Sequence, residues 1–176
     1  MTNKEFAEKY AGAAIEATKG TGIFPQTLLG QAILESSSGK SELSAKHNNF
    51  FGIKADPSWK GQKVIMRTRE VKNGQSIYID SAFRKYATPV ESFKDYVAFL
   101  KKNPRYTKAG VFTAPTYTDQ IDAIAKAGYA TALNYAASVK KVAANVVDVI
   151  AKYKPSNTNL LALGIIGIFT YLLLKW

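Results

Sequence analysis

Residues 25–54 read PQTLLGQAILESSSGKSELSAKHNNFFGIK, and this stretch decides the fold that the sequence predicts. Pro25 suits the first turn of a helix, and apolar residues recur with helical spacing from there to about Ser36. Leu28, Ala32 and Glu35 fall on one face of this helix. A carboxylate therefore ends an otherwise apolar stripe.

Patterns on either side of this stretch predict further helices. Thr2-Asn-Lys-Glu5 and Thr88-Pro-Val-Glu91 are capping boxes, and Gly128 suits the position after a helix end. The expected helices run over residues 2–19, 25–36, 41–46, 88–102, 118–127 and 132–153, each to within a few residues. We therefore expect a mostly helical α+β domain.

One β-hairpin is expected in the middle of the chain. Residues alternate between apolar and polar in Val64–Val71 and Ser76–Phe83, and Asn73-Gly74 lies between them. Asn-Gly between alternating segments is a strong signal for a two-residue turn. Pairing across such a turn places Glu70 opposite Ile77.

The composition excludes several kinds of chemistry. The 176 residues contain no cysteine and one histidine, His47. Thiol catalysis, disulfides and Cys/His zinc sites are therefore ruled out, and a Ser-His-Asp triad would have to use His47. We expect neither a metal site nor a cofactor.

The charge points to an acidic partner. The formal net charge is +11, and the excess is concentrated between residues 41 and 110. Nucleic acid, an anionic lipid surface and the anionic bacterial wall are all compatible with this charge. No run of five or six basic residues occurs, so we do not expect a nucleic-acid partner. The charge indicates nothing about the oligomeric state.

The end of the chain is strongly apolar. Residues 160–174, LLALGIIGIFTYLLL, carry no charge, and residues 154–159 resemble a linker. Fifteen helical residues span about 22 Å, and the flanking uncharged residues extend this to about 30 Å. We expect residues 1–153 to form the domain, 154–159 a linker and 160–176 a transmembrane helix that anchors the protein in a lipid membrane; a buried core helix is the alternative. The first residues lack the apolar segment of a signal peptide.

Glu35 is the residue with the clearest chemical potential. The C-terminal end of a helix carries partial negative charge, and apolar neighbours disfavour ionisation, so both effects raise the pKa of a carboxyl there. A glycosidase uses such an acid to protonate the departing glycosidic oxygen. A solvated glutamate at a helix end is the simpler interpretation of this position alone.

Sequence blocks in a fixed order resemble one known family, the bacterial and phage glucosaminidases (glycoside hydrolase family 73), which include the flagellar rod-associated wall hydrolase and many autolysins. The blocks extend over residues 24–153. They are GQAILESSSGKS at 30–41, NNFFGIK at 48–54, GQKV at 61–64, TRE at 68–70, FRKY at 83–86, SFKDY at 92–96, RY at 105–106, AGYAT at 127–131 and NYA at 134–136.

The resemblance implies a lysozyme-like fold and hydrolysis of the β-1,4 bond between N-acetylglucosamine and N-acetylmuramic acid in peptidoglycan. Glu35 matches the family's catalytic acid, Glu70 its second carboxylate on the hairpin, and Tyr129 a tyrosine that positions the sugar. The expected substrate-binding residues are Asn48, Asn49, Trp59, Arg84 and Tyr106.

Structural roles stand beside these expectations. The amides of Asn48 and Asn49 could serve a turn, Tyr129 could be mainly structural, and Arg84 could pair with a buried carboxylate. The chain also departs from the family pattern. Ser38 replaces an aromatic residue, and Ala132-Leu133 replaces Asp-Pro. Because of these departures, the sequence does not determine the packing of the loop after Glu35 or the residue at which the last helix begins.

The mechanism and setting allow alternatives. Glu70 could be the base for an attacking water, a nucleophile, or a support for attack by the substrate's acetamido group. Other possibilities are a lytic transglycosylase and an inactive wall-binding or structural protein. Because a wall hydrolase needs to reach the wall, we expect a phage protein in a virion membrane that serves entry, or a lysis enzyme at the host inner membrane.

Overall fold

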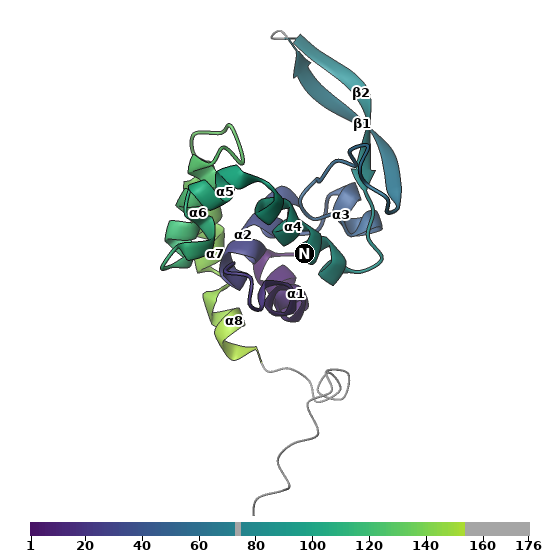
Figure 1. Ribbon diagram of the computed structural model, residues 1–176. Helices are drawn as coiled ribbons and strands as arrows, with labels where there is room; N and C mark the ends of the chain where they lie inside the picture. Colours follow the sequence, from purple (N-terminus) through teal and green to yellow (C-terminus); the bar gives the residue numbers. More distant parts are fainter. Residues whose placement is uncertain (73–74, 154–176) are drawn as a thin grey trace, which may run out of the picture.

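The computed structural model describes residues 1–72 and 75–153, and for residues 69–72 it describes the backbone alone. Helix α2 (Pro25–Glu35) is at the centre of the domain, and every residue from Thr27 to Ile33 is buried. Helices α1 (Asn3–Thr18), α6 (Tyr117–Lys126) and α7 (Tyr135–Ala144) pack around it (Figure 1). The predicted central helix is thus confirmed, and Glu35 is its last residue.

The helix ends follow the predicted capping signals. Both halves of the capping box are present at Thr2 and Glu5, where α1 begins. At the start of α4 (Pro89–Lys102), the side chain of Thr88 accepts from the N–H of Glu91, and the carboxylate of Glu91 accepts from the N–H of Ala87. Gly128 follows α6 with a φ of 78°, a left-handed conformation that favours glycine.

An aromatic cluster joins α1, α4 and the Asn-Asn-Phe-Phe segment. The ring of Phe50 packs edge-on against Phe6, Tyr10 and Phe93. Phe51 stacks on Tyr96 with ring centroids 4.0 Å apart. Both Phe50 and Phe51 are therefore core residues, and they fix the segment that follows the short helix α3 (Glu42–His47).

Strands β1 (Lys63–Lys72) and β2 (Gln75–Arg84) form the predicted antiparallel hairpin. Glu70 is paired with Ile77, as the sequence predicts. The hairpin projects away from the helices (Figure 1). In β2 the buried residues, Ser81 and Phe83, lie near the base of the hairpin, whereas Tyr78, nearer the turn, is exposed. The predicted turn residues Asn73 and Gly74 lie outside the described part.

The prediction of a single long helix over residues 132–153 is wrong. The chain forms α7 and then a separate helix, α8 (Val147–Lys152). Between the two helices the chain makes a tighter 3₁₀-type turn, in which the N–H of Asn145 donates to the carbonyl of Val142. The break lets α7 pack on α2 while α8 packs on α1. One straight helix could not serve both partners.

Two short elements were not predicted, α5 (Pro104–Lys108) and the 3₁₀ helix η1 (Val111–Thr113). Both are too short to show helical periodicity. The start of the last predicted helix also differs, because α7 begins at Tyr135 rather than at Ala132. Leu133, in the segment without Asp-Pro, is fully exposed.

The predicted linker at 154–159 and transmembrane helix at 160–176 lie outside the described residues. Within residues 1–72 and 75–153, no helix is both long and apolar enough to cross a membrane. The predicted anchor therefore stays a prediction.

Candidate active site

Glu35 lies at one wall of a cleft of about 750 Å³. The wall residues come from the end of α2, the segment before the hairpin, the end of β2, α4, α5 and the turn after α6. They include Glu35, Phe51, Lys54, Trp59, Arg84, Asp95, Phe99, Lys102, Arg105, Tyr106 and Tyr129. The structure therefore brings Glu35 together with four predicted site residues, namely Trp59, Arg84, Tyr106 and Tyr129.

A tight turn holds Glu35 at the cleft. Ser36 caps α2, its hydroxyl donating to the carbonyl of Ala32 and accepting from the N–H of Gly39. Ser37 and Ser38 both have a positive φ, and the hydroxyl of Ser38 donates to the side-chain oxygen of Asn3. The loop in which Ser38 replaces an aromatic residue is thus closed by polar bonds.

A chain of hydrogen bonds leads from the core to the Glu35 carboxylate. The Tyr96 hydroxyl donates to the side-chain oxygen of Gln31, and Gln31 Nε2 donates to Tyr135 Oη at 2.9 Å. Tyr135 Oη in turn donates to Glu35 Oε1 at 3.0 Å. Gln31 and Tyr96 are buried, so the chain fixes one side of the carboxylate.

Two opposing effects act on the pKa of Glu35. Its side chain reaches solvent at the cleft, but nearby protein atoms displace part of the water, and this burial raises its pKa. The hydrogen bond from Tyr135 stabilises the ionised form and lowers the pKa, by less than burial raises it. The net shift is upward, as a general acid requires.

Tyr129 and Tyr106 line the cleft next to this chain. Tyr129 is half-buried and stacks on Tyr135 with centroids 5.7 Å apart. Burial raises its pKa well above the usual value, so its hydroxyl stays protonated. Tyr106 is fully buried and accepts a hydrogen bond from Arg105 at 2.7 Å. Of the two tyrosines, Tyr129 has the ring more open to a ligand.

Asn48 and Asn49, two of the predicted substrate-binding residues, hydrogen-bond to backbone groups near the base of the hairpin. Asn49 is buried, and its Nδ2 donates to the carbonyls of Ile53 and Arg84 while its Oδ1 accepts from the N–H of Ile53. Asn48 Nδ2 donates to the carbonyls of Tyr86 and Ala87. Neither is among the residues that line the cleft. Both amides instead stabilise the backbone of the segments next to the cleft.

Arg84 forms ion pairs inside the cleft wall. Its Nη1 lies 2.9 Å from Asp95 Oδ2, and its Nη2 lies 2.8 Å from Asp56 Oδ2. Hydrogen bonds from Ser58, reinforced by Arg84, lower the pKa of Asp56 to about 2. The guanidinium is thus neutralised by two carboxylates, which is the alternative role that the sequence left open.

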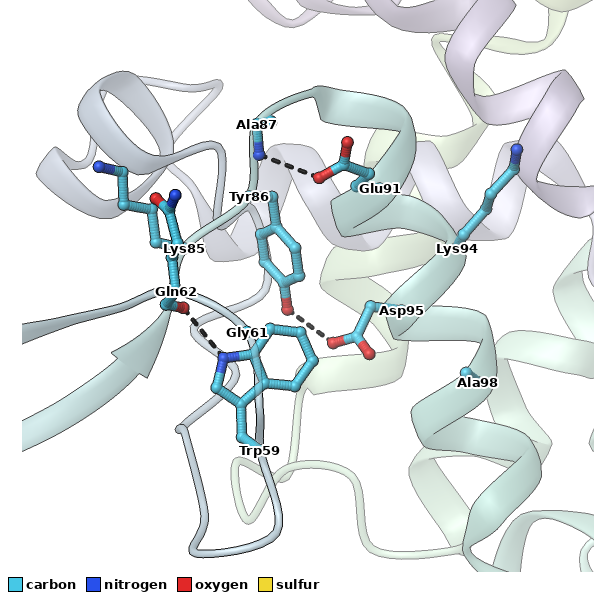
Figure 2. A pocket seen from close by; sticks show the side chains of 10 residues that line it. All are labelled: Trp59, Gly61, Gln62, Lys85, Tyr86, Ala87, Glu91, Lys94, Asp95 and Ala98. Carbon is cyan, nitrogen blue, oxygen red and sulfur yellow. Dashed lines mark hydrogen bonds between the residues drawn. The ribbon is translucent and has the colours of Figure 1, made fainter.

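Trp59 lines both the cleft and a second pocket of about 530 Å³, shown in Figure 2. Its indole N–H donates to the carbonyl of Gln62, and the Arg84 guanidinium lies 4.5 Å from the ring centroid. Tyr86 meets the indole edge-on and donates to Asp95. These contacts hold Trp59 in place as a flat apolar wall, a suitable platform for a sugar ring.

Glu70 is placed by its backbone alone. It pairs with Ile77 on the hairpin, and its side chain lies outside what the structure describes. Its distance from Glu35 and its part in the reaction therefore stay predictions. Within the described residues, no group of three or more His, Asp or Glu side chains could hold a metal ion.

Sequence reasoning missed Gln31, Tyr135 and Arg105 as parts of this site. Gln31 precedes Glu35 by one helical turn, so its place beside Glu35 was readable from the spacing. Tyr135 is 100 positions from Glu35, and no local pattern links the two. Arg105 lies beside Tyr106 in the family block at 105–106, but the sequence alone indicates no role for it.

Comparisons with known proteins identify relatives of this chain. The family model described as glucosaminidase, mannosyl-glycoprotein endo-beta-N-acetylglucosaminidase, matches residues 11–147. The chain is 40% identical over 144 residues to the peptidoglycan hydrolase FlgJ of Vibrio cholerae, covering 80% of this chain and 43% of that protein. It is 37% identical over 123 residues to the exo-glucosaminidase LytG of Bacillus subtilis, covering 68% of this chain and 43% of LytG.

A solved structure of the glycoside hydrolase domain of FlgJ from Salmonella typhimurium superposes with a TM-score of 0.69 at 36% identity. The match covers 82% of this chain and 97% of that truncated domain. The chain spans less than half the length of the two full-length relatives described above. From the family match and these identities, the chain belongs to the glucosaminidase family of glycoside hydrolases.

Proposed function

We propose that this protein is a peptidoglycan hydrolase that cleaves the β-1,4 bond between N-acetylglucosamine and N-acetylmuramic acid, with Glu35 as the general acid. The observation that carries the proposal is the position of Glu35. It combines a raised pKa, a fixed carboxylate and a place on the wall of a cleft. Family membership and the similarity to peptidoglycan hydrolases support peptidoglycan as the substrate.

In the proposed reaction, the glycan strand lies along the cleft, and protonated Glu35 donates its proton to the glycosidic oxygen. The bond from that oxygen to the anomeric carbon breaks, and water supplies the hydroxyl of the new reducing end. The Tyr135 hydroxyl supports this step because it holds one carboxylate oxygen and leaves the other to face the strand. Trp59 and Tyr129 offer ring surfaces to the sugars.

We assign Glu70 the role of base for the attacking water, which gives inversion of the anomeric configuration. Its support is the family pattern and its position on β1. A retained product would overturn this assignment and favour attack by Glu70 itself or by the substrate's acetamido group. NMR of the first-formed product distinguishes these outcomes.

The test of the whole proposal is digestion of purified peptidoglycan with the full chain, followed by mass spectrometry. New reducing ends should be N-acetylglucosamine, and the Glu35→Gln variant should lose activity by at least about 100-fold. Glu42→Gln, on the exposed face of α3, is the matched control and should behave as wild type.

The outcomes separate the candidates. Anhydro products would identify a lytic transglycosylase instead. Lysis by Glu35→Gln at the wild-type rate would remove Glu35 from the mechanism. A wild-type protein that binds the wall without cutting it would indicate a binding or structural protein.

We further propose that residues 160–176 anchor the enzyme in a membrane and that it is carried in a phage particle, for entry through the wall. The uncharged run at 160–174 supports the anchor. Purified particles should contain the protein and release it on lipid extraction. If it is absent from particles but present in the membranes of infected cells, it is instead a lysis enzyme.

A further inference from the structure

Two cations, Lys102 and Arg105, stand on the cleft wall that α4 and α5 form. Both residues are exposed, and they are separated by Asn103 and by Pro104, which begins α5. We propose that they form a carboxylate-binding subsite for the muramyl unit of the substrate, which selects acidic peptidoglycan over neutral N-acetylglucosamine polymers. The proposal rests on the proposed function and adds the recognition of an anionic group to it.

Arg105 is held in place by protein contacts. Its Nη2 donates to Tyr106 Oη at 2.7 Å, and its guanidinium carbon lies 4.8 Å from the centroid of the same ring. Tyr106 is fully buried, so the support is rigid. A guanidinium that is already ordered loses less entropy on binding a ligand than a free one does.

The guanidinium also lies close to the reacting region. A β-carbon built on Gly128 would be 3.8 Å from Arg105 Nη1, and Gly128 directly precedes Tyr129. Tyr129 stacks on Tyr135, which donates to Glu35. Arg105 and Glu35 thus line the same cleft, with Tyr129 and Tyr135 between them along this series of contacts.

Neither cation has a carboxylate partner in the parts of the chain that the structure describes. Arg84, in the same cleft, is paired with both Asp56 and Asp95. Glu35 also lines the cleft, but its recorded bond is to Tyr135. An ordered guanidinium beside a substrate channel, with free N–H groups and a second cation nearby, is suited to a carboxylate.

The proposed substrate offers this group on one of its two sugars. N-acetylglucosamine is neutral, whereas muramic acid carries a lactyl ether group. The lactyl carboxylate is free in a strand stripped of peptides, and in a complete strand it is amide-linked to a peptide with carboxylates of its own. Arg105 and Lys102 therefore recognise a carboxylate from either source.

The test combines a change in the substrate with a change in the protein. Soluble glycan–peptide fragments are used intact and after removal of the peptides, each with and without conversion of its carboxylates to amides. The kcat/KM of each fragment is measured with the full-length wild type, Arg105→Gln and Lys102→Gln. Lys108→Gln, on α5 outside the cleft, is the matched control.

With wild type, amidation should lower kcat/KM by about 5- to 20-fold, the range for a partly solvated charge-assisted hydrogen bond. Arg105→Gln should lose about as much on the intact fragment and little more on the amidated one, because the two changes remove the same contact. Lys102→Gln should show the same pattern with smaller losses, that is, a lower kcat/KM on the intact fragment and little further loss on the amidated one. Lys108→Gln should match wild type on every fragment.

The peptide-free fragment identifies the source. If amidation of the peptide-free fragment lowers kcat/KM, the lactyl carboxylate is recognised, and if only amidation of the intact fragment does, the peptide carboxylates are. Independent, multiplicative losses from amidation and from both variants would overturn the subsite, as would a wild type indifferent to amidation of both the intact and the peptide-free fragment. The Lys102 side chain forms no hydrogen bond or ion pair within the described residues, so Lys102→Gln keeps the test decisive if Arg105→Gln disturbs Tyr106. Failure of the proposed function is distinct, because wild type would then cut none of the fragments.

Discussion

The carboxylate of Glu35 receives two opposing influences from its neighbours. Partial burial makes ionisation unfavourable, whereas the Tyr135 hydroxyl stabilises the ionised form. Because burial has the larger effect, the pKa is raised, and a larger fraction of the enzyme carries the proton near neutral pH. Activity should therefore fall on the alkaline side as Glu35 ionises.

Tyr135→Phe removes one of the two influences. Without the hydroxyl, the ionised carboxylate loses a donor, so the pKa of Glu35 rises and the alkaline limb of the kcat/KM profile moves to higher pH. At the optimum, kcat/KM should fall by up to about 10-fold, since the carboxylate is less well oriented. Tyr117→Phe is the control, because no hydrogen bond of its hydroxyl is recorded in the described part of the chain. A limb that stays in place in Tyr135→Phe would contradict the prediction.

Asn49 shows how one amide stabilises an entire loop. Asn49→Ala removes three hydrogen bonds and leaves the buried N–H of Ile53 without its acceptor. The free energy of unfolding should fall by about 2–4 kcal/mol, measured by urea denaturation. The exposed Asn145, changed to alanine, should lose less than about 1 kcal/mol. Equal losses in the two variants would show that the Asn49 bonds add no stability.

At the scale of the helices, the site depends on how closely α2 and α7 approach. A β-carbon on Gly30 would lie 3.0 Å from that of Ala143 and 3.3 Å from the carbonyl of Val139. The absence of a side chain at Gly30 therefore lets α7 lie against α2. This contact brings Tyr135, the first residue of α7, to Glu35, the last residue of α2.

Gly30→Leu should separate these two helices. We expect the free energy of unfolding to fall by about 1–3 kcal/mol, because overpacking strains the interface. We also expect kcat to fall more than KM changes, since the hydrogen bond to Glu35 is lengthened. Ala137→Leu, on the exposed face of α7, is the control. Urea denaturation and steady-state kinetics measure both effects, and normal kcat in a destabilised Gly30→Leu would contradict the second one.

At the scale of the whole molecule, the described residues build a continuous hydrophobic core. Its buried members extend from Phe6 in α1 to Val146, just before α8, and α8 closes the domain against α1. We therefore expect a fragment of residues 1–153 to fold and to retain the active site. The apolar run at 160–174 is then available for a lipid membrane.

Truncation after Tyr153 should separate hydrolysis from membrane binding. The fragment should digest soluble glycan–peptide fragments within about twofold of the full chain, because the cleft residues are all retained. It should no longer co-sediment with phospholipid vesicles, whereas the full chain should. Equal sedimentation of the two forms would mean that residues 160–176 are not an anchor.

The sequence by itself determined the local structure. The capping boxes at Thr2 and Thr88, the helical spacing from Pro25 to Glu35 and the pairing of Glu70 with Ile77 are all observed. Each depends on residues only a few positions apart along the chain, where backbone preferences and capping bonds act. The position of Glu35 as a candidate acid could be predicted for the same reason.

Only the tertiary structure decided which distant groups meet. Tyr135 reaches Glu35 across 100 positions, and Arg84 turns toward Asp56 and Asp95 rather than standing free. The break between α7 and α8 follows from packing on two different helices. These outcomes depend on burial and on the approach of whole elements, and the order of residues along the chain does not encode such contacts locally.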